Sequence, residues 1–311
     1  MPEQPPQPPP CELAPDVDDA SPAPLDEGLH PGPALYVVPT PLGNLKDASP
    51  RARGVLAQVD VIAAEDTRTA QKLLQLLGVR SRARLVSYHE HNDASRAESL
   101  AAWMAREGLR VALVSDAGTP ACSDPGYRLI RAALDVGARV IPLPGPAAFL
   151  CALMASGLPT DRFLFVGFLP SKREARRQAL EDLKDHHASL CLYESPRRLV
   201  ELLEDVAQVL GPSRRVSVSR ELTKRHEETL RGLAADLAAE LSARGEVRGE
   251  VSLVIEGAPP EAQEGGDQAQ ARKLAALLRK HGLKPAQIKE VVAEHCGLSK
   301  KDVYAMLLED R

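Results

Sequence analysis

The sequence predicts an α/β protein with two α/β domains, the first built on a mainly parallel sheet, followed by a small C-terminal helical domain. Short apolar runs alternate with amphipathic segments from residue 34 onward, which is typical of parallel sheets covered by helices. Several of these runs end in loops rich in Gly and Pro, and ligands of such folds bind beyond the carboxyl ends of the strands. The last segment, from about residue 267, is helical in pattern and basic.

The segment before residue 34 differs from the rest of the chain. Residues 1–32 hold ten of the 26 prolines and seven acidic residues but no Lys or Arg. This composition cannot bury enough apolar surface to fold, so residues 1–33 are predicted to be a disordered acidic tail. They also lack the basic start and apolar centre of a secretory signal. Without the tail, 39 basic residues face 36 acidic ones, and the remaining chain is mildly basic.

Cysteine and histidine usage favours neither a disulfide framework nor a metal site. The five cysteines are scattered and form no C-x-x-C pair. His89 and His91 alternate on a predicted loop, which is a weak metal signal without further ligands, so no metal is expected. The longest apolar stretch, residues 147–155, is about half the length that spans a bilayer. We therefore expect a cytoplasmic protein with no membrane partner.

The first domain is predicted to span residues 34–156. Between its strands lie amphipathic segments such as residues 71–77, and Ser95 with Glu98 predicts a capping box at the start of a helix. Alternation of strand and helix predicts a mainly parallel sheet. The expected strands are residues 35–38, 61–64, 85–87, 111–115 and 140–143.

The second α/β domain is predicted over residues 157–257, and its first helix is indicated by Ser171 and Glu174, another possible capping box. Residues 258–266 are rich in Pro and Gly and predict a flexible linker. Residues 267–311 predict three short helices resembling a helix-turn-helix, with a turn at Gly297. Its basic residues could hold phosphates; alternatively, it is a solvated bundle that caps the second domain. The expected strands are residues 163–166, 190–193, 215–218 and 251–255.

Three strand-end loops of the first domain could converge on one cleft. They are residues 40–44, 115–120 and 144–148. Asp116 follows a buried strand directly, at a position where a cofactor could be recognised. The alternative is that Gly and Pro only mark turns, as they do in most loops. The rigid Leu-Pro-Gly-Pro sequence at 143–146 favours a preformed pocket.

Acidic and basic residues also follow other strands, for example at 65–68, 193–198 and 219–224. Adjacent acids and bases most often form structural ion pairs, which is the simpler interpretation for each motif alone. No Gly-x-Gly-x-x-Gly follows the first strand and no P-loop is present. A standard dinucleotide site or class I methyltransferase site is therefore not supported, and a cofactor must be held in another way.

Taken together, seven ordered motifs resemble the small-subunit ribosomal RNA methyltransferases, the RNA-acting branch of the tetrapyrrole methylase family. The resemblance runs from about residue 35 to 257 and continues weakly through the terminal helices. The motifs are VPTPLGNL (38–45), AEDTR (64–68), VSDAGTP (114–120) with DPGY (124–127), PLPGP (142–146), GFLP (167–170), YESPRR (193–198) and RELTK (220–224).

This resemblance implies a two-domain tetrapyrrole-methylase-like fold with S-adenosyl-L-methionine bound in the cleft between the domains, usually in a homodimer. It implies 2′-O-methylation of the ribose of a cytidine in the decoding region of 16S ribosomal RNA, with free RNA or the assembled 30S subunit as partner. The implied cofactor-binding residues are Pro41, Gly43, Ser115, Asp116, Ala117, Gly118, Thr119, Pro120, Pro144, Gly145, Pro146, Ala147, Ala148, Phe168, Leu169 and Tyr193.

A ribose hydroxyl is a poor nucleophile, so a base or a cation that lowers its pKa should assist the transfer. The candidates, which the sequence does not rank, are Glu65, His89, Glu194 and Lys224. Candidate contacts to the RNA are Arg68, Arg197, Arg220, Lys300 and Lys301.

Two other functions compete with this interpretation. The same fold serves small-molecule methyltransferases that act on a tetrapyrrole or corrinoid, but the basic terminal helices suit a phosphate backbone better. A non-enzymatic nucleic-acid-binding protein would use only the terminal helices, and it leaves the three strand-end loops unexplained.

Overall fold

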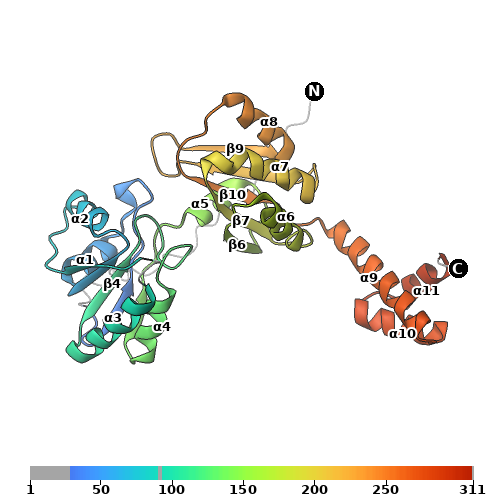
Figure 1. The fold of residues 1–311 in the computed structure, drawn as a ribbon, viewed down its shortest axis with the longest axis horizontal. Coiled ribbons are helices and arrows are strands. Elements are labelled where there is room, and N and C mark those ends of the chain that lie inside the picture. The colour runs from blue at the N-terminus through green and yellow to red at the C-terminus, as the bar shows by residue number, and fades with distance from the viewer. Residues whose placement is uncertain (1–28, 90–92, 310–311) are drawn as a thin grey trace, which may run out of the picture.

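The computed structural model describes residues 29–89 and 93–309, and shows two α/β units followed by a helical unit (Figure 1). Most of the predicted tail lies outside the described residues. Its last part is folded, because Leu29 packs against the first core and the backbone N–H of His30 donates to Tyr36 Oη at 2.7 Å. The start of the first unit is therefore a few residues earlier than composition predicts.

The first sheet has five strands, all parallel, in the order β3-β2-β4-β1-β5. The prediction of a mainly parallel sheet is confirmed, and each expected strand appears within one residue of its predicted position. The strands are β1 (Ala34–Val37), β2 (Val61–Ala64), β3 (Arg84–Ser87), β4 (Arg110–Val114) and β5 (Arg139–Pro142). Strands β1, β2 and β4 are apolar and buried along almost their whole length, because helices cover both faces of the sheet.

Helices α1 (Pro50–Gln58) and α2 (Thr67–Leu76) pack on one face of this sheet, and α3 (Asp93–Glu107) and α4 (Tyr127–Asp135) pack on the other. A short 3-10 helix, η1 (Leu45–Asp47), precedes α1. Because α3 begins at Asp93, Ser95 and Glu98 lie inside the helix and the predicted capping box is wrong.

The second sheet also has five strands, in the order β6-β7-β10-β8-β9, and only its β6–β7 pair is parallel. Strand β9 was not predicted, because its sequence carries charges and a glycine and pairs only at the edge with β8. The strands are β6 (Phe163–Phe168), β7 (Ser189–Glu194), β8 (Arg215–Arg220), β9 (Glu228–Leu233) and β10 (Val251–Ile255).

One face of the second sheet is covered by α6 (Arg173–Asp182), α7 (Leu199–Val209) and α8 (Ala234–Arg244), with η2 (Pro196–Arg198) leading into α7. Lys172 is the N-cap of α6 and makes no side-chain cap bond, so the capping box predicted from Ser171 and Glu174 is also wrong.

Helix α5 (Ala148–Ser156) covers the opposite face of the second sheet. Its buried Ala152 and Leu153 pack with Cys191 of β7 and Val254 of β10. The sequence assigned this helix to the first domain. Its apolar surface instead finds its partners on the second sheet, so the chain passes from one unit to the other at residues 143–147, before α5.

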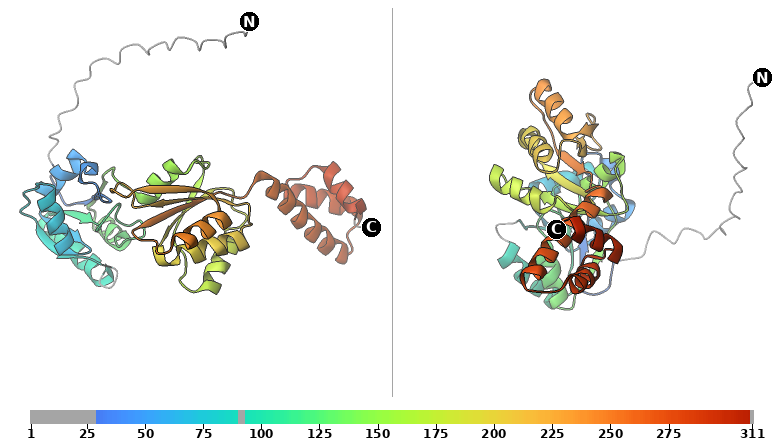
Figure 2. Two further views of the ribbon diagram at one scale, coloured as in Figure 1. Left: turned by 90° about the horizontal axis from the view of Figure 1, so that it is seen from above. Right: turned by 90° about the vertical axis from the view of Figure 1, so that its right-hand side faces the viewer.

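The helical unit consists of α9 (Pro260–Lys280), α10 (Pro285–Cys296) and α11 (Lys300–Glu309), which pack around a small core that includes Val292 and Val303. It projects beyond the second sheet, at the far end of the molecule from the first sheet (Figures 1 and 2). Since α9 starts at Pro260, most of the predicted flexible linker 258–266 is helical. No helix in the described part of the chain is long and apolar enough to cross a membrane.

Candidate active site

The loops that follow β1, β4 and β5 are tied together at the carboxyl edge of the first sheet. Thr40 and Gly118 exchange two backbone hydrogen bonds, of 2.8 and 3.0 Å. Thr40 Oγ1 donates to the carbonyl of Ser115 at 3.1 Å, and Thr119 Oγ1 donates to the carbonyl of Pro146 at 2.8 Å. These contacts hold the three loops in one fixed arrangement.

Two glycines allow this close approach. A Cβ atom on Gly145 would lie 2.5 Å from the Cβ of Pro39, so the loops after β1 and β5 could not pack as they do with any larger residue. A Cβ atom on Gly43 would overlap the side chain of Lys224. The loop after β1 therefore also contacts the second unit.

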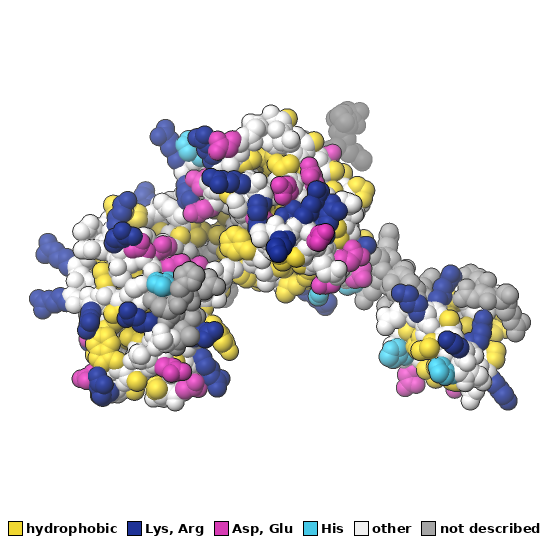
Figure 3. All heavy atoms as spheres, in the orientation of Figure 1, with side chains coloured by type: hydrophobic (Ala, Val, Ile, Leu, Met, Phe, Trp, Pro, Cys, Tyr) yellow, Lys and Arg dark blue, Asp and Glu magenta, His cyan; other side chains and the backbone are white. Residues whose placement is uncertain are grey.

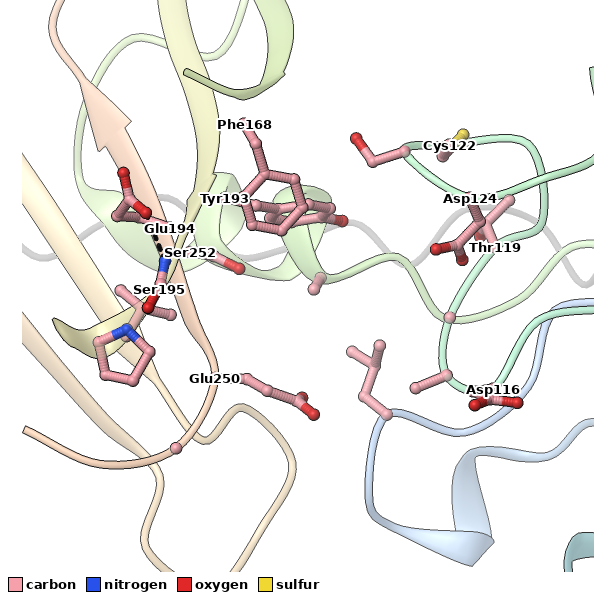
Figure 4. A pocket seen from close by; sticks show the side chains of 18 of the residues that line it. Asp116, Thr119, Cys122, Asp124, Phe168, Tyr193, Glu194, Ser195, Glu250 and Ser252 are labelled. Atoms are coloured by element: carbon pink, nitrogen blue, oxygen red, sulfur yellow. Dashed lines mark hydrogen bonds between the residues drawn. The ribbon is translucent and has the colours of Figure 1, made fainter. Parts of the chain in front are cut away.

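A cavity of about 410 Å³ lies between these loops and the second unit (Figure 4). This volume is typical of sites for small molecules and cofactors. The first unit contributes Leu42, Glu65, Asp116, Ala117, Gly118, Thr119, Cys122, Ser123 and Asp124 to its lining. The rest of the lining is Ala148, Phe168, Tyr193, Glu194, Ser195, Pro196, Gly249, Glu250, Val251 and Ser252.

The charged residues of the first-unit wall of the cavity, Glu65, Asp116 and Asp124, are all carboxylates. Burial raises the pKa of Asp124 to about 6, and the neighbouring carboxylates of Glu65 and Asp116 add to this while a hydrogen bond with Ser115 opposes it. Burial also raises the pKa of Asp116, whose Oδ1 accepts a hydrogen bond from the backbone N–H of Asp66 at 3.3 Å. Crowded carboxylates disfavour each other's ionised form, so this wall favours a cationic ligand.

Aromatic rings form part of the opposite wall. The rings of Phe168 and Tyr193 lie 5.6 Å apart, and Phe165 meets Tyr193 edge-on at 5.1 Å. Tyr193 Oη accepts a hydrogen bond from the backbone N–H of Phe149 at 3.2 Å, and burial raises the pKa of Tyr193 to about 12. Phe168 is 59% exposed although it is large and apolar, which makes it available to a flat ligand.

The four candidate catalytic residues have different environments, and two of them line the cavity. Glu65 lines it directly. Glu194 also lines it, but its Oε1 accepts from Arg198 Nε at 2.7 Å and from the backbone N–H of Ser195 at 2.6 Å. Arg198 Nη2 donates to the other oxygen at 2.8 Å. Glu194 is therefore held in a buried ion pair that orders the end of β7.

Lys224 and His89 do not line the cavity. Lys224 Nζ lies 2.9 Å from Glu221 Oε1 and 3.1 Å from Glu250 Oε2. Burial alone would lower the pKa of Lys224, but these two carboxylates outweigh it and raise the pKa above its ordinary value. A lysine held protonated in this way cannot accept a proton. His91 lies outside the described residues.

Seven of the sixteen expected cofactor-binding residues line the cavity: Asp116, Ala117, Gly118, Thr119, Ala148, Phe168 and Tyr193. The others do not line it: Pro41, Gly43, Ser115, Pro120, Pro144, Gly145, Pro146, Ala147 and Leu169. Ser115 is buried and its Oγ donates to the carbonyl of Gly118 at 3.1 Å. Leu169 belongs to the second core, and its carbonyl accepts from Arg198 Nη2 at 3.1 Å.

Sequence reasoning did not select five carboxylate or hydroxyl residues of the cavity, Ser123, Asp124, Ser195, Glu250 and Ser252. The sequence could have indicated Asp124 as a site residue, because it stands eight residues after Asp116 and directly before Pro and Gly. Glu250 and Ser252 lie at the start of β10, more than 120 residues further along the chain, and only the packing of the two units brings them to the cavity.

The five candidate RNA-contacting residues are spread over the molecule. Arg68 is exposed and lies 3.2 Å from Asp66, and Arg220 Nη2 lies 3.2 Å from Glu228 Oε2. Arg197 is exposed in η2. Lys300, 3.5 Å from Glu290, and the exposed Lys301 begin α11, far from the cavity (Figure 1).

The fold and the cavity between its two units define a methylase of the tetrapyrrole class. The family model for tetrapyrrole (corrin/porphyrin) methylases matches residues 34–238, and the chain belongs to this family of methyltransferases. Among solved structures, a cobalt precorrin-4 methyltransferase of cobalamin biosynthesis shares the fold, with a TM-score of 0.53 and 18% identity. The match covers 74% of this chain and 98% of that one.

More similar relatives carry the name ribosomal RNA small subunit methyltransferase I. The relative from Micromonospora olivasterospora is 48% identical over 270 residues, covering 87% of this chain and 85% of that protein. The relative from Escherichia coli O157:H7 is 45% identical over 279 residues, covering 89% of this chain and 95% of that protein.

Proposed function

We propose that this protein is an S-adenosylmethionine-dependent methyltransferase of small-subunit ribosomal RNA, and that it methylates the ribose 2′-hydroxyl of a cytidine in the decoding region. One observation carries the proposal: a chain 48% identical to a ribosomal RNA small subunit methyltransferase I has an acidic and aromatic cavity at the strand ends of its first sheet. Because the substrate is ribosomal, we also propose that the protein acts in the cytoplasm.

The residues of the cavity fit S-adenosylmethionine. When bound, this cofactor supplies an electrophilic methyl group on a cationic sulfur, without a metal. Asp116 and Asp124 offer negative charge to a cation, and Phe168 and Tyr193 offer apolar ring faces. Thr119 lies on the loop after β4, which forms part of the first-unit wall of the cavity. We assign cofactor binding to these residues.

The protein's own contribution is mainly positioning. The hydrogen bonds between Thr40 and Gly118 and from Thr119 to Pro146 fix the loops before a ligand arrives, so little ordering is needed on binding. A preformed site that holds two reactants in line supplies much of the rate of a transfer reaction. Glu250 and Ser252 approach from the second unit and can contact a substrate that enters between the units.

We further propose that the protein acts as a homodimer, as the family resemblance implies. Exposed apolar side chains on α5 and β6 support this, namely Leu150, Met154 and Phe163. Met154 is 75% exposed, so Met154→Asp should convert a dimer to a monomer in light scattering without loss of folding. A wild-type monomer at micromolar concentration would contradict this part of the proposal.

The deciding experiment uses 30S subunits from a strain that lacks this activity. The protein is incubated with them and methyl-labelled S-adenosylmethionine, and the recovered RNA is digested to nucleosides. The expected product is labelled 2′-O-methylcytidine. If S-adenosylmethionine binds but no label enters RNA, the protein is instead a small-molecule methyltransferase of the same fold.

A further inference from the structure

Asp124 is held in the cavity by an unusual loop between β4 and α4. Two non-glycine residues of this loop, Ala121 and Ser123, have positive φ angles of 68° and 62°. Such conformations are costly and persist only where the surroundings impose them. The loop also packs closely against the second unit, since a Cβ atom on Gly167 of β6 would lie 2.8 Å from Ser123 Oγ. The Asp124 side chain points into the cavity (Figure 4).

The charged groups around Asp124 are almost all acidic. Glu65 and Asp116 face it from the first unit, and Glu250 lines the same cavity from the second, where it is paired with Lys224 Nζ at 3.1 Å. Among the described residues that line the cavity, none is Lys or Arg. The remaining titratable neighbours are Glu194, which is paired with Arg198, and the Cys122 and Tyr193 side chains, which burial keeps protonated. Nothing in the cavity lining therefore neutralises Asp124 unless a cationic ligand does.

We propose that Asp124 accepts the proton that the substrate hydroxyl loses during methyl transfer. This inference rests on the proposed function, in which the acceptor is a hydroxyl. The O–H bond breaks and its proton passes to an Oδ atom of Asp124. The oxygen forms a bond to the methyl carbon, and the electron pair of the broken C–S bond stays on sulfur.

The charges in the cavity favour an ionised Asp124 before methyl transfer and a protonated Asp124 after it. Beside a cationic donor, the Asp124 carboxylate is ionised and ready to accept. Once the methyl group is transferred, the sulfur atom would no longer carry a positive charge, and Asp124 would again face the carboxylates of Glu65 and Asp116. Their repulsion together with burial raises its pKa to about 6, which favours taking up the proton. Glu194 and Lys224 cannot do this, because one is held by Arg198 and the other is already protonated.

The first test is a binding measurement that requires no RNA. Isothermal titration calorimetry at pH 6.0, in two buffers of different ionisation enthalpy, counts the protons released when S-adenosylmethionine or S-adenosylhomocysteine binds. The cationic ligand should release about half a proton from the wild type, because about half of the Asp124 carboxyls are protonated at that pH. The neutral product should release much less. Asp124→Asn should abolish the difference, and the control variant Asp236→Asn, at an exposed carboxylate of α8 that does not line the cavity, should keep it.

The second test is the rate of methyl transfer to 30S subunits in a single turnover. Asp124→Asn should lower this rate by about 10²- to 10⁴-fold, while its affinity for S-adenosylhomocysteine stays within about threefold of the wild type. Glu65→Gln should have a smaller effect on the rate. A rate for Asp124→Asn within about fivefold of the wild type, or unchanged proton release, would overturn the inference.

Two further results keep the inference separate from folding defects and from the proposed function. If Asp124→Asn does not bind S-adenosylhomocysteine, Ser115→Ala replaces it. The hydrogen bond with Ser115 lowers the pKa of Asp124, so its removal should raise that pKa further. In a plot of transfer rate against pH, the fall of the rate on the acid side should then begin at a higher pH than in the wild type. A fall at the same pH as in the wild type contradicts the inference. A wild type that releases the proton but transfers no methyl group to RNA contradicts the proposed function instead.

Discussion

Gly145 shows how one residue without a side chain can decide the shape of a cavity. Its contact with Pro39 joins two rigid segments, so neither can move aside for a methyl group. Gly145→Ala should therefore weaken S-adenosylmethionine binding by at least tenfold, or about 1.4 kcal/mol, as measured by calorimetry. The matched control is Gly54→Ala in α1, where nothing lies within 4 Å of the added Cβ. That variant should bind normally, and its free energy of unfolding should be about 0.5–1 kcal/mol higher. Wild-type affinity in Gly145→Ala would contradict the packing argument.

Asp124 should cost the protein stability at neutral pH. Its pKa in the folded chain is about 6, above the ordinary value of 3.8, so the folded state binds more protons between these values and stability falls as the pH rises through them. Asp124→Asn should raise the melting temperature by about 2–4 °C at pH 7.5, allowing for partial solvent exposure, and leave it unchanged near pH 3.5. Equal shifts at both pH values would show that the effect does not come from ionisation.

The sequence predicted a site residue correctly where the residue's position is set by the strand directly before it. Asp116 directly follows a buried strand, and the spacing of strand and acid was enough to place it in a cavity. The same reasoning could not separate Glu65 from Glu194, because the ion pair that occupies Glu194 forms with Arg198 in a geometry that sequence spacing does not reveal. Nor could it find Glu250, whose position depends on the packing of β10 against β7.

At the scale of elements, α6 and α7 are joined by a buried ion cluster. Arg176 Nη2 lies 2.7 Å from Asp205 Oδ2, both side chains are completely buried, and Arg173 and Arg177 also contact Asp205. Burial alone would raise the pKa of Asp205, but hydrogen bonds from the three arginines outweigh it and lower the pKa below its ordinary value.

Asp205→Ala should leave the Arg176 charge buried without its partner. The free energy of unfolding, measured by urea denaturation at pH 7, should fall by about 3–5 kcal/mol. Because the pKa of Asp205 is lower in the folded state, the contribution of this carboxylate is present above its unfolded pKa and is lost as the pH falls through the folded value. The difference between wild type and variant should therefore shrink below about pH 4. Asp236→Ala, in the exposed part of α8, serves as control and should change stability by less than about 0.5 kcal/mol.

The elements themselves were predictable wherever their own periodicity defines them. All five strands of the first sheet were found, because buried parallel strands are apolar throughout. Strand β9 was missed because its stability comes from pairing with β8 rather than from its sequence. The two predicted capping boxes failed because neither helix starts where Ser and Glu stand at the expected spacing: α3 begins at Asp93, two residues before Ser95, and the N-cap of α6 is Lys172, one residue after Ser171.

At the scale of the whole molecule, the helical unit stands away from the cavity and carries exposed basic side chains (Figure 3). Lys300 and Lys301 at the start of α11 are suited to phosphate contacts that extend the footprint on a long RNA. The double variant Lys300→Glu/Lys301→Glu should weaken binding to 16S ribosomal RNA in filter assays. The slope of log affinity against log salt concentration should become shallower by about one for each phosphate that the variant no longer neutralises. Its affinity for S-adenosylmethionine should not change.

The matched control for this variant is Arg106→Glu/Arg131→Glu on the first unit. These arginines are 71% and 68% exposed, close to the 66% of Lys300, and each is paired with an acid on its own helix. Equal decreases of RNA affinity in the two double variants would show that only net charge matters, and that the helical unit has no particular role.

The route of the chain between the two units has a mechanical consequence. Residues 143–147 form the only crossing from the first sheet to the second in the described chain, and they lead directly into Ala148 at the wall of the cavity. A rotation of one unit against the other would pivot about this crossing, so parts near the pivot move least. Contacts made by Thr119 and Ala148 would then persist at every degree of opening, whereas those of Glu250 on the far wall would form only as the two units approach. The position of a single connection thus makes the two halves of the site differ in how far such a rotation would move them.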